Sequence, residues 1–411
     1  MNSLKSLAMN CGPLSETIRS LASGFCRSRR RRQLPWQLNR ESGISRRMSR
    51  NAPRTANLSS EKIVFGITPN GSEVEKYTFK NGRQMEVSIL SYGGIIQSIV
   101  VPDQSGELAD VTLGFDQLED YLKPNPFFGA IIGRYGNRIA QGRFSLNGRQ
   151  YQIPINDGTN ALHGGPEGFD KKLWAATPIQ ASDWIGVELA YLSPDGEMGF
   201  PGNLSVKVRY TLSTDNELRI DYSAATDQTT IVNLTNHTYF NLAGAGSGTV
   251  LDEIAWIDAE RFTPVVQGLI PTGESQQVKG TPLNFTTPIP IGTHIQASDA
   301  QLKYAEVNQG GYDHNWILNH PGDLAALATR VTDPKSGRTV EMYTTEPGVQ
   351  FYSGNFLNGT VKGKQGRTYA HWGGFTLEAQ HYPDSPNHAH FPRTELHPGE
   401  TYSQTTIYKF P

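Results

Sequence analysis

Cysteine is nearly absent from this chain. Its 411 residues include two, Cys11 and Cys26, and both lie near the N-terminus. Residues 59–411 therefore offer no disulfide, no thiolate metal site and no cysteine nucleophile, a composition that fits a reducing compartment. Long apolar runs are also missing, because no stretch approaches the ~20 residues that a membrane-spanning helix needs. We expect no membrane partner.

Acidic residues are scarce in residues 1–58, which hold 12 Lys and Arg but two acids, Glu16 and Glu41. The segment has a formal charge of +10, and the remaining 25 basic and 37 acidic residues give residues 59–411 a charge of −12. An acidic body does not favour nucleic acid as a partner.

Residues 1–58 read as a basic leader rather than as part of the fold. They are rich in Ser and Arg, include the arginine run 29–32, and lack the apolar core of a secretion signal. Two interpretations stay open: an organellar transit peptide, for a plastid or mitochondrion, or sequence upstream of a true start at Met48, which predicts a cytoplasmic protein. A nuclear-targeting or nucleic-acid-binding arm is a weaker interpretation. In each case we expect a disordered segment that takes no part in catalysis.

Helical periodicity is scarce in residues 59–411, whereas alternation of apolar and polar residues is frequent. Residues 204–212 and 218–224 alternate on both sides of an Asp-Asn turn, which predicts a β-hairpin with one buried face. Further strands are expected at the ranges 85–101 (a pair broken at Tyr92-Gly93-Gly94), 110–115 and 341–345, and a helical turn or two at 115–122 and 323–327. Closely spaced strands without intervening helices favour an all-β sandwich, and no linker divides it.

The most informative segment is the run of residues 233–242, Asn-Leu-Thr-Asn-His-Thr-Tyr-Phe-Asn-Leu, which reads as a strand around His237. Its apolar residues can anchor a strand in a core, but its Asn and Thr side chains exceed what a core strand needs. Because buried polar groups must be paired, this density predicts a wall that orients His237 toward a polar ligand. A lone histidine would more often be structural.

Four other segments accompany this histidine. They are Gly133-Arg134-Tyr135-Gly136-Asn137-Arg138-Ile139, Asn160-Ala161-Leu162-His163-Gly164-Gly165, Gly310-Gly311-Tyr312-Asp313-His314-Asn315 and Gly373-Gly374-Phe375-Thr376-Leu377-Glu378-Ala379-Gln380. Together with the His237 segment they resemble the aldose 1-epimerase (galactose mutarotase) family, from about Phe65 to the C-terminus. The resemblance implies that residues 59–411 form a single large antiparallel β-sandwich, the galactose mutarotase-like supersandwich.

The resemblance also implies a reaction, the interconversion of the α and β anomers of free hexoses such as galactose and glucose. One group takes the proton of the C1 hydroxyl while another protonates the ring oxygen, and neither a metal nor another cofactor is required. By resemblance, Glu378 is the base, His237 is the acid, and His163 binds the sugar and stabilises charge at the ring oxygen. The substrate-binding residues implied are Asn137, Arg138, Asp313 and Gln350.

A metal site is an alternative interpretation of His388-Ala389-His390, which places two imidazoles close together, with His381 and Asp384 nearby. No HExxH helix, cysteine or calcium-loop motif accompanies them, so a surface loop is favoured and no metal is expected. The aromatic residues near the motifs, which can stack on a sugar or simply fill the core, are Tyr135, Tyr239, Phe240 and Phe351.

Two other functions are compatible with the same fold. A hexose-6-phosphate 1-epimerase needs a basic cluster for the phosphate, and the motifs offer Arg134 and Arg138 beside the acidic Asp313, which favours neutral sugars. A non-catalytic carbohydrate-binding domain has no reason to hold both His237 and Glu378. The partner expected is a small-molecule sugar, and the protein is expected to be a monomer or a weak homodimer.

Overall fold

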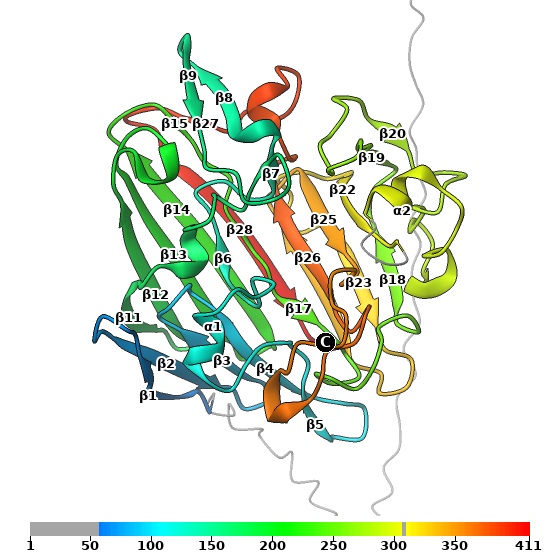
Figure 1. Cartoon of the computed structure of the whole chain (residues 1–411). Helices are drawn as coiled ribbons and strands as arrows, with labels where there is room; N and C mark the ends of the chain where they lie inside the picture. The colour runs from blue at the N-terminus through cyan, green and yellow to red at the C-terminus, as the bar shows by residue number, and fades with distance from the viewer. Residues whose placement is uncertain (1–56, 306–309) are drawn as a thin grey trace, which may run out of the picture. The chain divides into compact units, whose positions relative to one another are not determined.

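The structure, a computed structural model, describes residues 57–305 and 310–411, which belong to one compact unit. The leader expected at residues 1–58 lies outside the described residues, apart from Asn57 and Leu58. Strands dominate the described part, and their ladders are antiparallel (Figure 1). The all-β class predicted from the alternation is therefore confirmed.

The largest sheet among the described residues has nine strands. In spatial order they are β11 (Ala175–Gln180), β12 (Trp184–Ser193), β13 (Leu204–Ser213), β14 (Glu217–Thr226), β28 (Tyr402–Lys409), β24 (Thr339–Thr344), β23 (Thr329–Thr332), β18 (Ile254–Ile257) and β21 (Ile289–Pro290).

A second sheet of six strands carries much of the candidate site. Its order is β17 (Tyr239–Phe240), β26 (Phe375–Gln380), β25 (Gly348–Tyr352), β22 (Asp313–Ile317), β19 (Arg261–Thr263) and β20 (Gln276–Gln277). Figure 1 shows β22, β25 and β26 side by side, although β22 is separated from β26 by more than fifty residues of chain.

The N-terminal part of the described chain forms a five-stranded meander of β1 (Ser59–Ile67), β2 (Glu73–Lys80), β3 (Glu86–Leu90), β4 (Ile96–Pro102) and β5 (Leu108–Asp110). Four short pairs complete the ladders: β6 (Ile131–Ile132) with β16 (Thr235–Asn236), β7 (Arg138–Ile139) with β10 (Ala161–Leu162), β8 (Arg143–Leu146) with β9 (Arg149–Gln152), and β15 (Thr230–Ile231) with β27 (Glu395–Leu396).

Helices are short in the described part. The α-helices are α1 (Leu118–Tyr121) and α2 (Ala300–Tyr304), and the 3₁₀ turns are Ala140–Gly142, Phe169–Lys171, Glu197–Gly199, Ile291–Thr293, Lys364–Gly366 and Ser385–Asn387. No helix that the structure describes has the length and apolar character to cross a membrane.

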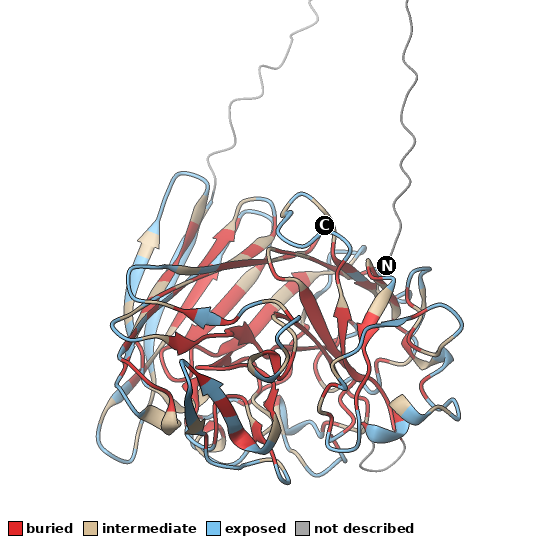
Figure 2. Cartoon of the chain, turned by 90° about the horizontal axis from the view of Figure 1, so that it is seen from above, coloured by how far each residue is buried: buried red, intermediate tan, exposed pale blue. Residues whose placement is uncertain are grey.

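The core lies between the sheets, whose strands are largely buried while the connecting loops are exposed (Figure 2). On β28, the Tyr408 hydroxyl donates to the Leu377 carbonyl at 2.8 Å, and the Gln404 amide donates to the Ala379 carbonyl at 3.0 Å. These bonds join the nine-stranded sheet to β26. Because side chains alternate along a strand, Leu377 packs in the core while Glu378 points to the opposite face.

The hairpin predicted from the alternating runs is confirmed as β13 and β14, which pair from Leu204 with Thr226 to Leu212 with Leu218. The strands expected at 85–101 and 341–345 appear as β3, β4 and β24, and α1 lies within the expected helical turn at 115–122.

Two expectations about local structure were wrong. The strand expected at 110–115 ends at Asp110, because the Asp110 carboxylate accepts hydrogen bonds from the Thr112 backbone N–H at 3.0 Å and hydroxyl at 2.9 Å and so bends the chain. The helical turn expected at 323–327 is a hydrogen-bonded turn instead, in which the Asp323 side chain accepts from the Ala325 N–H at 2.9 Å. Helix α2 was not anticipated, although Asp299 caps its N-terminus.

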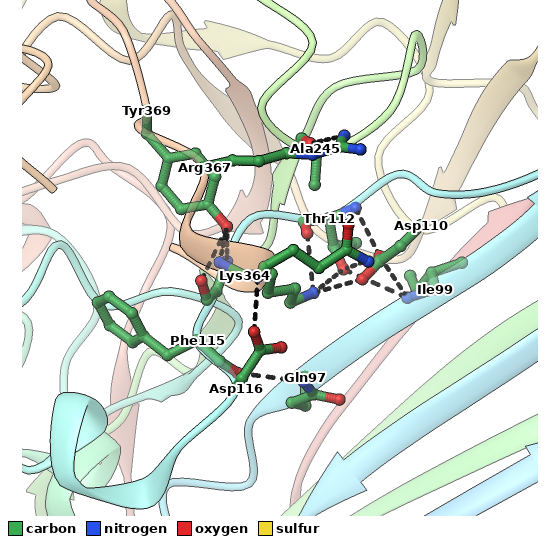
Figure 3. A network of polar contacts seen from close by, with 12 residues as sticks. Gln97, Ile99, Asp110, Thr112, Phe115, Asp116, Ala245, Lys364, Arg367 and Tyr369 are labelled. Carbon is green, nitrogen blue, oxygen red and sulfur yellow. Dashed lines mark hydrogen bonds and ion pairs between the residues drawn. The ribbon is translucent and has the colours of Figure 1, made fainter. Parts of the chain in front are cut away.

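The segment that connects β25 to β26 is held in place by a buried lysine. Lys364 Nζ donates to the Asp110 carboxylate at 2.7 Å and to the Thr112 carbonyl at 2.9 Å (Figure 3). The Tyr369 hydroxyl donates to the Gly114 carbonyl at 2.8 Å. These bonds tie the connection between two strands of the six-stranded sheet to the end of β5.

Candidate active site

The residues of the five motifs meet at one cavity of about 170 Å³. Its walls come from β7, β10, β17, β22, β25, β26, the β16–β17 connection and loop residues. The lining residues are Pro126, Phe127, Asn137, Arg138, Asp157, Leu162, His163, His237, Tyr239, Asp313, Tyr352, Phe356 and Glu378.

Glu378 reaches the cavity from the middle of β26 and is almost fully buried. Thr376, two residues earlier and therefore on the same face of the strand, donates from its hydroxyl to Glu378 Oε1 at 2.9 Å. Glu378 Oε2 is buried and has no hydrogen-bond partner among the described residues. One carboxylate oxygen is thus positioned by the strand, and the other is free to accept a hydrogen bond from a ligand.

His237 lies where the expected strand of residues 233–242 is interrupted. Asn236 Oδ1 accepts from the Thr238 backbone N–H at 3.1 Å and hydroxyl at 2.6 Å, which forms a tight turn between β16 and β17. The turn directs the His237 ring into the cavity, where its Nε2 lies 3.5 Å from Glu378 Oε1. The asparagines of this run mostly bind backbone carbonyls, for example Asn241 Nδ2 to Gly373 at 2.9 Å, so they fix the segment rather than face a ligand.

His163 faces His237 across the cavity, with ring centroids 5.1 Å apart. Asn137 adopts a left-handed backbone conformation, with φ 62°. In this conformation its backbone N–H donates to His163 Nδ1 at 3.2 Å. Because Nδ1 accepts a hydrogen bond, the proton of the neutral imidazole resides on Nε2. His163 therefore presents a hydrogen-bond donor, not an acceptor, through its other nitrogen.

Arg138 and Asp313 form a charged wall beside these groups. Arg138 Nη1 lies 3.6 Å from Asp313 Oδ2, and its Nε donates to Asp157 at 2.7 Å. Gln350 does not line the cavity; its amide donates to Asp313 Oδ1 at 2.7 Å and orients that carboxylate. Burial raises the pKa of Asp313, while Arg138 and Gln350 oppose the shift.

Burial also sets the protonation of the central groups. Desolvation, assisted by the nearby negative charge of Asp313, raises the pKa of Glu378 to about 8. Desolvation lowers the pKa of His237 to about 4, and it lowers the pKa of His163 well below the usual value, with help from His237 and Arg138. At a pH between the pKa of His237, about 4, and that of Glu378, about 8, the Glu378–His237 pair as a whole holds one proton.

Among the residues that the structure describes, His163, His237 and Glu378 form a group whose donor atoms lie within 4.8 Å of one another and which could hold a metal ion. The hydrogen bonds do not fit that role. A metal-bound histidine donates its second N–H to an acceptor, but His163 Nδ1 faces the Asn137 N–H, a donor. His237 Nδ1 has no partner in the described chain. The arrangement suits proton transfer better than metal binding.

Aromatic side chains cover the cavity, but most are not those that the sequence suggested. Tyr239 lines it, whereas Tyr135, Phe240 and Phe351 pack in the core. The lining aromatics that sequence reasoning missed are Phe127, Tyr352 and Phe356. Phe127 packs against both imidazoles, at centroid distances of 4.7 Å to His163 and 5.7 Å to His237.

Two other groups named from the sequence lie outside the cavity. His388 Nε2 is 3.4 Å from Asp384, and His390 contacts the Gly273 carbonyl, but the two imidazoles join no cluster of three potential ligands in the described residues. Arg134 is buried elsewhere and donates to the Pro201 carbonyl at 2.9 Å and the Ser193 hydroxyl at 2.6 Å. It is not available to bind a phosphate in the cavity.

Comparison with known proteins gives a consistent picture. A family model described as aldose 1-epimerase matches residues 75–409. A galactose mutarotase of Bos taurus is 48% identical over 354 residues, which are 86% of this chain and 99% of that protein. An aldose 1-epimerase of Escherichia coli (strain K12) is 39% identical over 346 residues, or 84% and 97% of the two chains. The crystal structure of a galactose 1-epimerase from Lactobacillus acidophilus NCFM matches with a TM-score of 0.76 at 29% identity, covering 86% of this chain and 99% of that one.

Proposed function

Since this chain belongs to the aldose 1-epimerase family, we propose that it interconverts the α and β anomers of free hexoses such as galactose and glucose. Its substrate is a small-molecule sugar, and Glu378 and His237 are its acid–base pair. The single observation that supports these roles best is the Nε2–Oε1 distance of 3.5 Å between His237 and Glu378 in one buried cavity.

The reaction needs two proton transfers that balance. Glu378 takes the proton of the C1 hydroxyl, the bond between C1 and the ring oxygen breaks, and His237 gives a proton to that oxygen. The open-chain aldehyde then rotates about its C1–C2 bond. On closure, the C5 hydroxyl attacks the other face of the aldehyde and returns its proton to His237, while Glu378 returns its proton to the former carbonyl oxygen.

The pair must hold one proton for this cycle to begin. With Glu378 ionised and His237 protonated, a base and an acid stand ready on the same sugar. This form has the same number of protons as the form in which Glu378 and His237 are both neutral. At neutral pH the two forms therefore interconvert by moving a proton within the pair, without proton exchange with solvent. His163, a fixed Nε2–H donor, stabilises the charge that develops on the ring oxygen.

Arg138 and Asp313, which form the charged wall of the cavity, orient the sugar. The planar fork of donors on Arg138 suits neighbouring hydroxyl oxygens, and Asp313 accepts hydrogen bonds from hydroxyls. Asn137 acts through His163 and through its own side chain, whose Oδ1 accepts from the Arg138 N–H at 2.9 Å. Gln350 acts through Asp313.

The test is the optical rotation of freshly dissolved α-D-galactose and α-D-glucose, followed with and without the protein. The proposal requires a rate well above the spontaneous one, saturable in sugar. A protein that binds these sugars without accelerating their mutarotation would be the non-catalytic binding domain. The sequestration of Arg134 gives the hexose-6-phosphate alternative no support.

We further propose that residues 59–411 form the aldose 1-epimerase domain, which acts as a monomer or weak homodimer. The bovine relative is covered over 99% of its length by 86% of this chain, so the remaining part of this chain has no counterpart in it. A fusion of residues 1–58 to a reporter tests the compartment. If the segment is a transit peptide, the reporter enters an organelle and the segment is cleaved. A reporter that stays uncleaved and diffuse would mean a cytoplasmic protein that starts at Met48.

A further inference from the structure

The sugar cavity holds one carboxylate that the proposed reaction does not use. Asp157 lines the cavity, and 36% of its side chain is exposed, compared with 9% for Asp313 and 6% for Arg138. Its Oδ2 accepts from Arg138 Nε at 2.7 Å. Asp157 is thus the acidic group of the wall that solvent, and an entering sugar, reaches most easily.

The turn that carries Asp157 is firmly held. The Asp157 N–H donates to the Asn160 carbonyl at 3.1 Å, and the Asn160 N–H donates back to the Asp157 carbonyl at 2.8 Å. The Asn160 side chain anchors the turn, because Oδ1 accepts from the Gln141 N–H at 3.0 Å and Nδ2 donates to the Gly268 carbonyl at 3.2 Å. The carboxylate is therefore a positioned part of the cavity.

The local charge balance is negative. Arg138 is the one lysine or arginine among the lining residues, and it is shared by Asp157 and Asp313. A sugar that carries a carboxylate or phosphate would find no unpaired lysine or arginine among the lining residues and would face the carboxylates of Asp157 and Asp313. In a cavity of about 170 Å³, no part of a bound hexose lies far from these charges.

We propose that Asp157 is a specificity-determining residue, which restricts the enzyme to neutral aldoses by occupying Arg138 and repelling anionic sugars. The inference rests on the proposed function and adds a substrate class to it. Specificity of this kind depends on a repulsive element as much as on attractive contacts. Without the Asp157 charge, Arg138 faces one carboxylate instead of two, and the repulsion of an anionic sugar is reduced.

The experiment compares three sugars of the same ring: D-galactose, D-galacturonate and the neutral methyl ester of D-galacturonate. For the wild-type protein we expect kcat/KM for galacturonate to be at least about tenfold below that for its ester. In Asp157→Asn, whose amide oxygen still accepts from Arg138, this gap should shrink by about tenfold. The gap is a ratio of two kcat/KM values measured on one variant, so a general loss of activity in Asp157→Asn does not alter it. Added salt should narrow the wild-type gap.

Asp252→Asn is the matched control, because Asp252 is 73% exposed, pairs with Lys335 and does not line the cavity. It should leave the gap unchanged. A wild-type protein that uses galacturonate as well as its ester, or an Asp157→Asn gap equal to the wild-type gap, would overturn the inference. Absence of galactose mutarotation by the wild-type protein would instead refute the proposed function, so the two failures are distinguishable.

Discussion

The two oxygens of Glu378 have different environments. Oε1 is held by the Thr376 hydroxyl and lies beside His237, whereas Oε2 is buried without a partner in the described chain. A buried acceptor without a partner is costly, and a sugar hydroxyl would satisfy it. Because Glu378 also lines the cavity, this free acceptor is available to a ligand.

Replacing Glu378 by glutamine keeps the shape of the side chain and removes its proton affinity. We expect kcat for galactose mutarotation to fall by ~100-fold or more while KM changes little. Glu253→Gln is the control, since Glu253 is also buried, burial raises its pKa well above the usual value, and it lies outside the cavity. Near-normal kcat in Glu378→Gln would remove this residue from the mechanism.

The two histidines should respond differently to substitution by asparagine. His237→Asn removes the proposed proton donor, so kcat should fall much more than KM rises, and the dependence of rate on pH should lose one limb. His163→Asn removes the proposed hydrogen bond to the ring oxygen and should cost less, about 10-fold to 100-fold in kcat. A larger loss in His163→Asn would reverse the two roles.

At the scale of elements, the sequence was most informative where a pattern is local. The alternation in residues 204–224 specified a hairpin, and the density of polar residues around His237 marked the segment that carries it. Asp157 and Phe127 escaped notice because each belongs to a loop whose position depends on contacts with distant segments. The residues around Asp157 have no local periodicity that would indicate a cavity wall.

The turn residues of the site show the same limit. The break between β16 and β17 depends on the Asn236 side chain, and a period-two pattern continues through it. The single strand predicted across residues 233–242 is therefore two short strands, β16 and β17, with a turn between them. His237 owes its position in the cavity to that interruption.

The connection between β25 and β26 depends on Lys364, which allows a prediction at the element scale. Lys364→Ala leaves the Asp110 carboxylate without its cation, and we expect a loss of about 3 kcal/mol in the free energy of unfolding. Urea denaturation measures this loss. Lys335→Ala is the control: its ion pair with Asp252 is exposed, with 77% and 73% of the two side chains accessible, and should contribute less than about 1 kcal/mol. Equal losses in the two variants would show that the Lys364 pair is not structurally important.

At the scale of the whole molecule, the charge divides the chain into two parts. Residues 1–58 have a formal charge of +10, and residues 59–411 have a charge of −12. We expect a protein that begins at Met48 to be soluble, to unfold at the same temperature and to have the same kcat/KM as the full chain, because the basic segment has too few apolar residues for a core. Aggregation or loss of activity would mean that the segment contributes to the fold.

Catalysis should not depend on a metal ion. Dialysis of the whole protein against EDTA is expected to leave mutarotase activity unchanged, because His163 presents an N–H rather than a lone pair to the cavity. Activity that disappears with EDTA and returns with zinc would contradict this expectation and give the cluster of His163, His237 and Glu378 a different role.

The central claim is that Glu378 and His237 share one proton, and the pH dependence of kcat/KM for α-D-galactose tests it most directly. When the pH is below the pKa of His237, about 4, both groups are protonated and no base remains. When the pH is above the pKa of Glu378, about 8, both groups are deprotonated and no acid remains. After subtraction of the spontaneous rate, we predict a bell-shaped profile with its plateau between these values, and loss of one limb in His237→Asn. A wild-type rate that keeps rising above pH 8 would contradict the account.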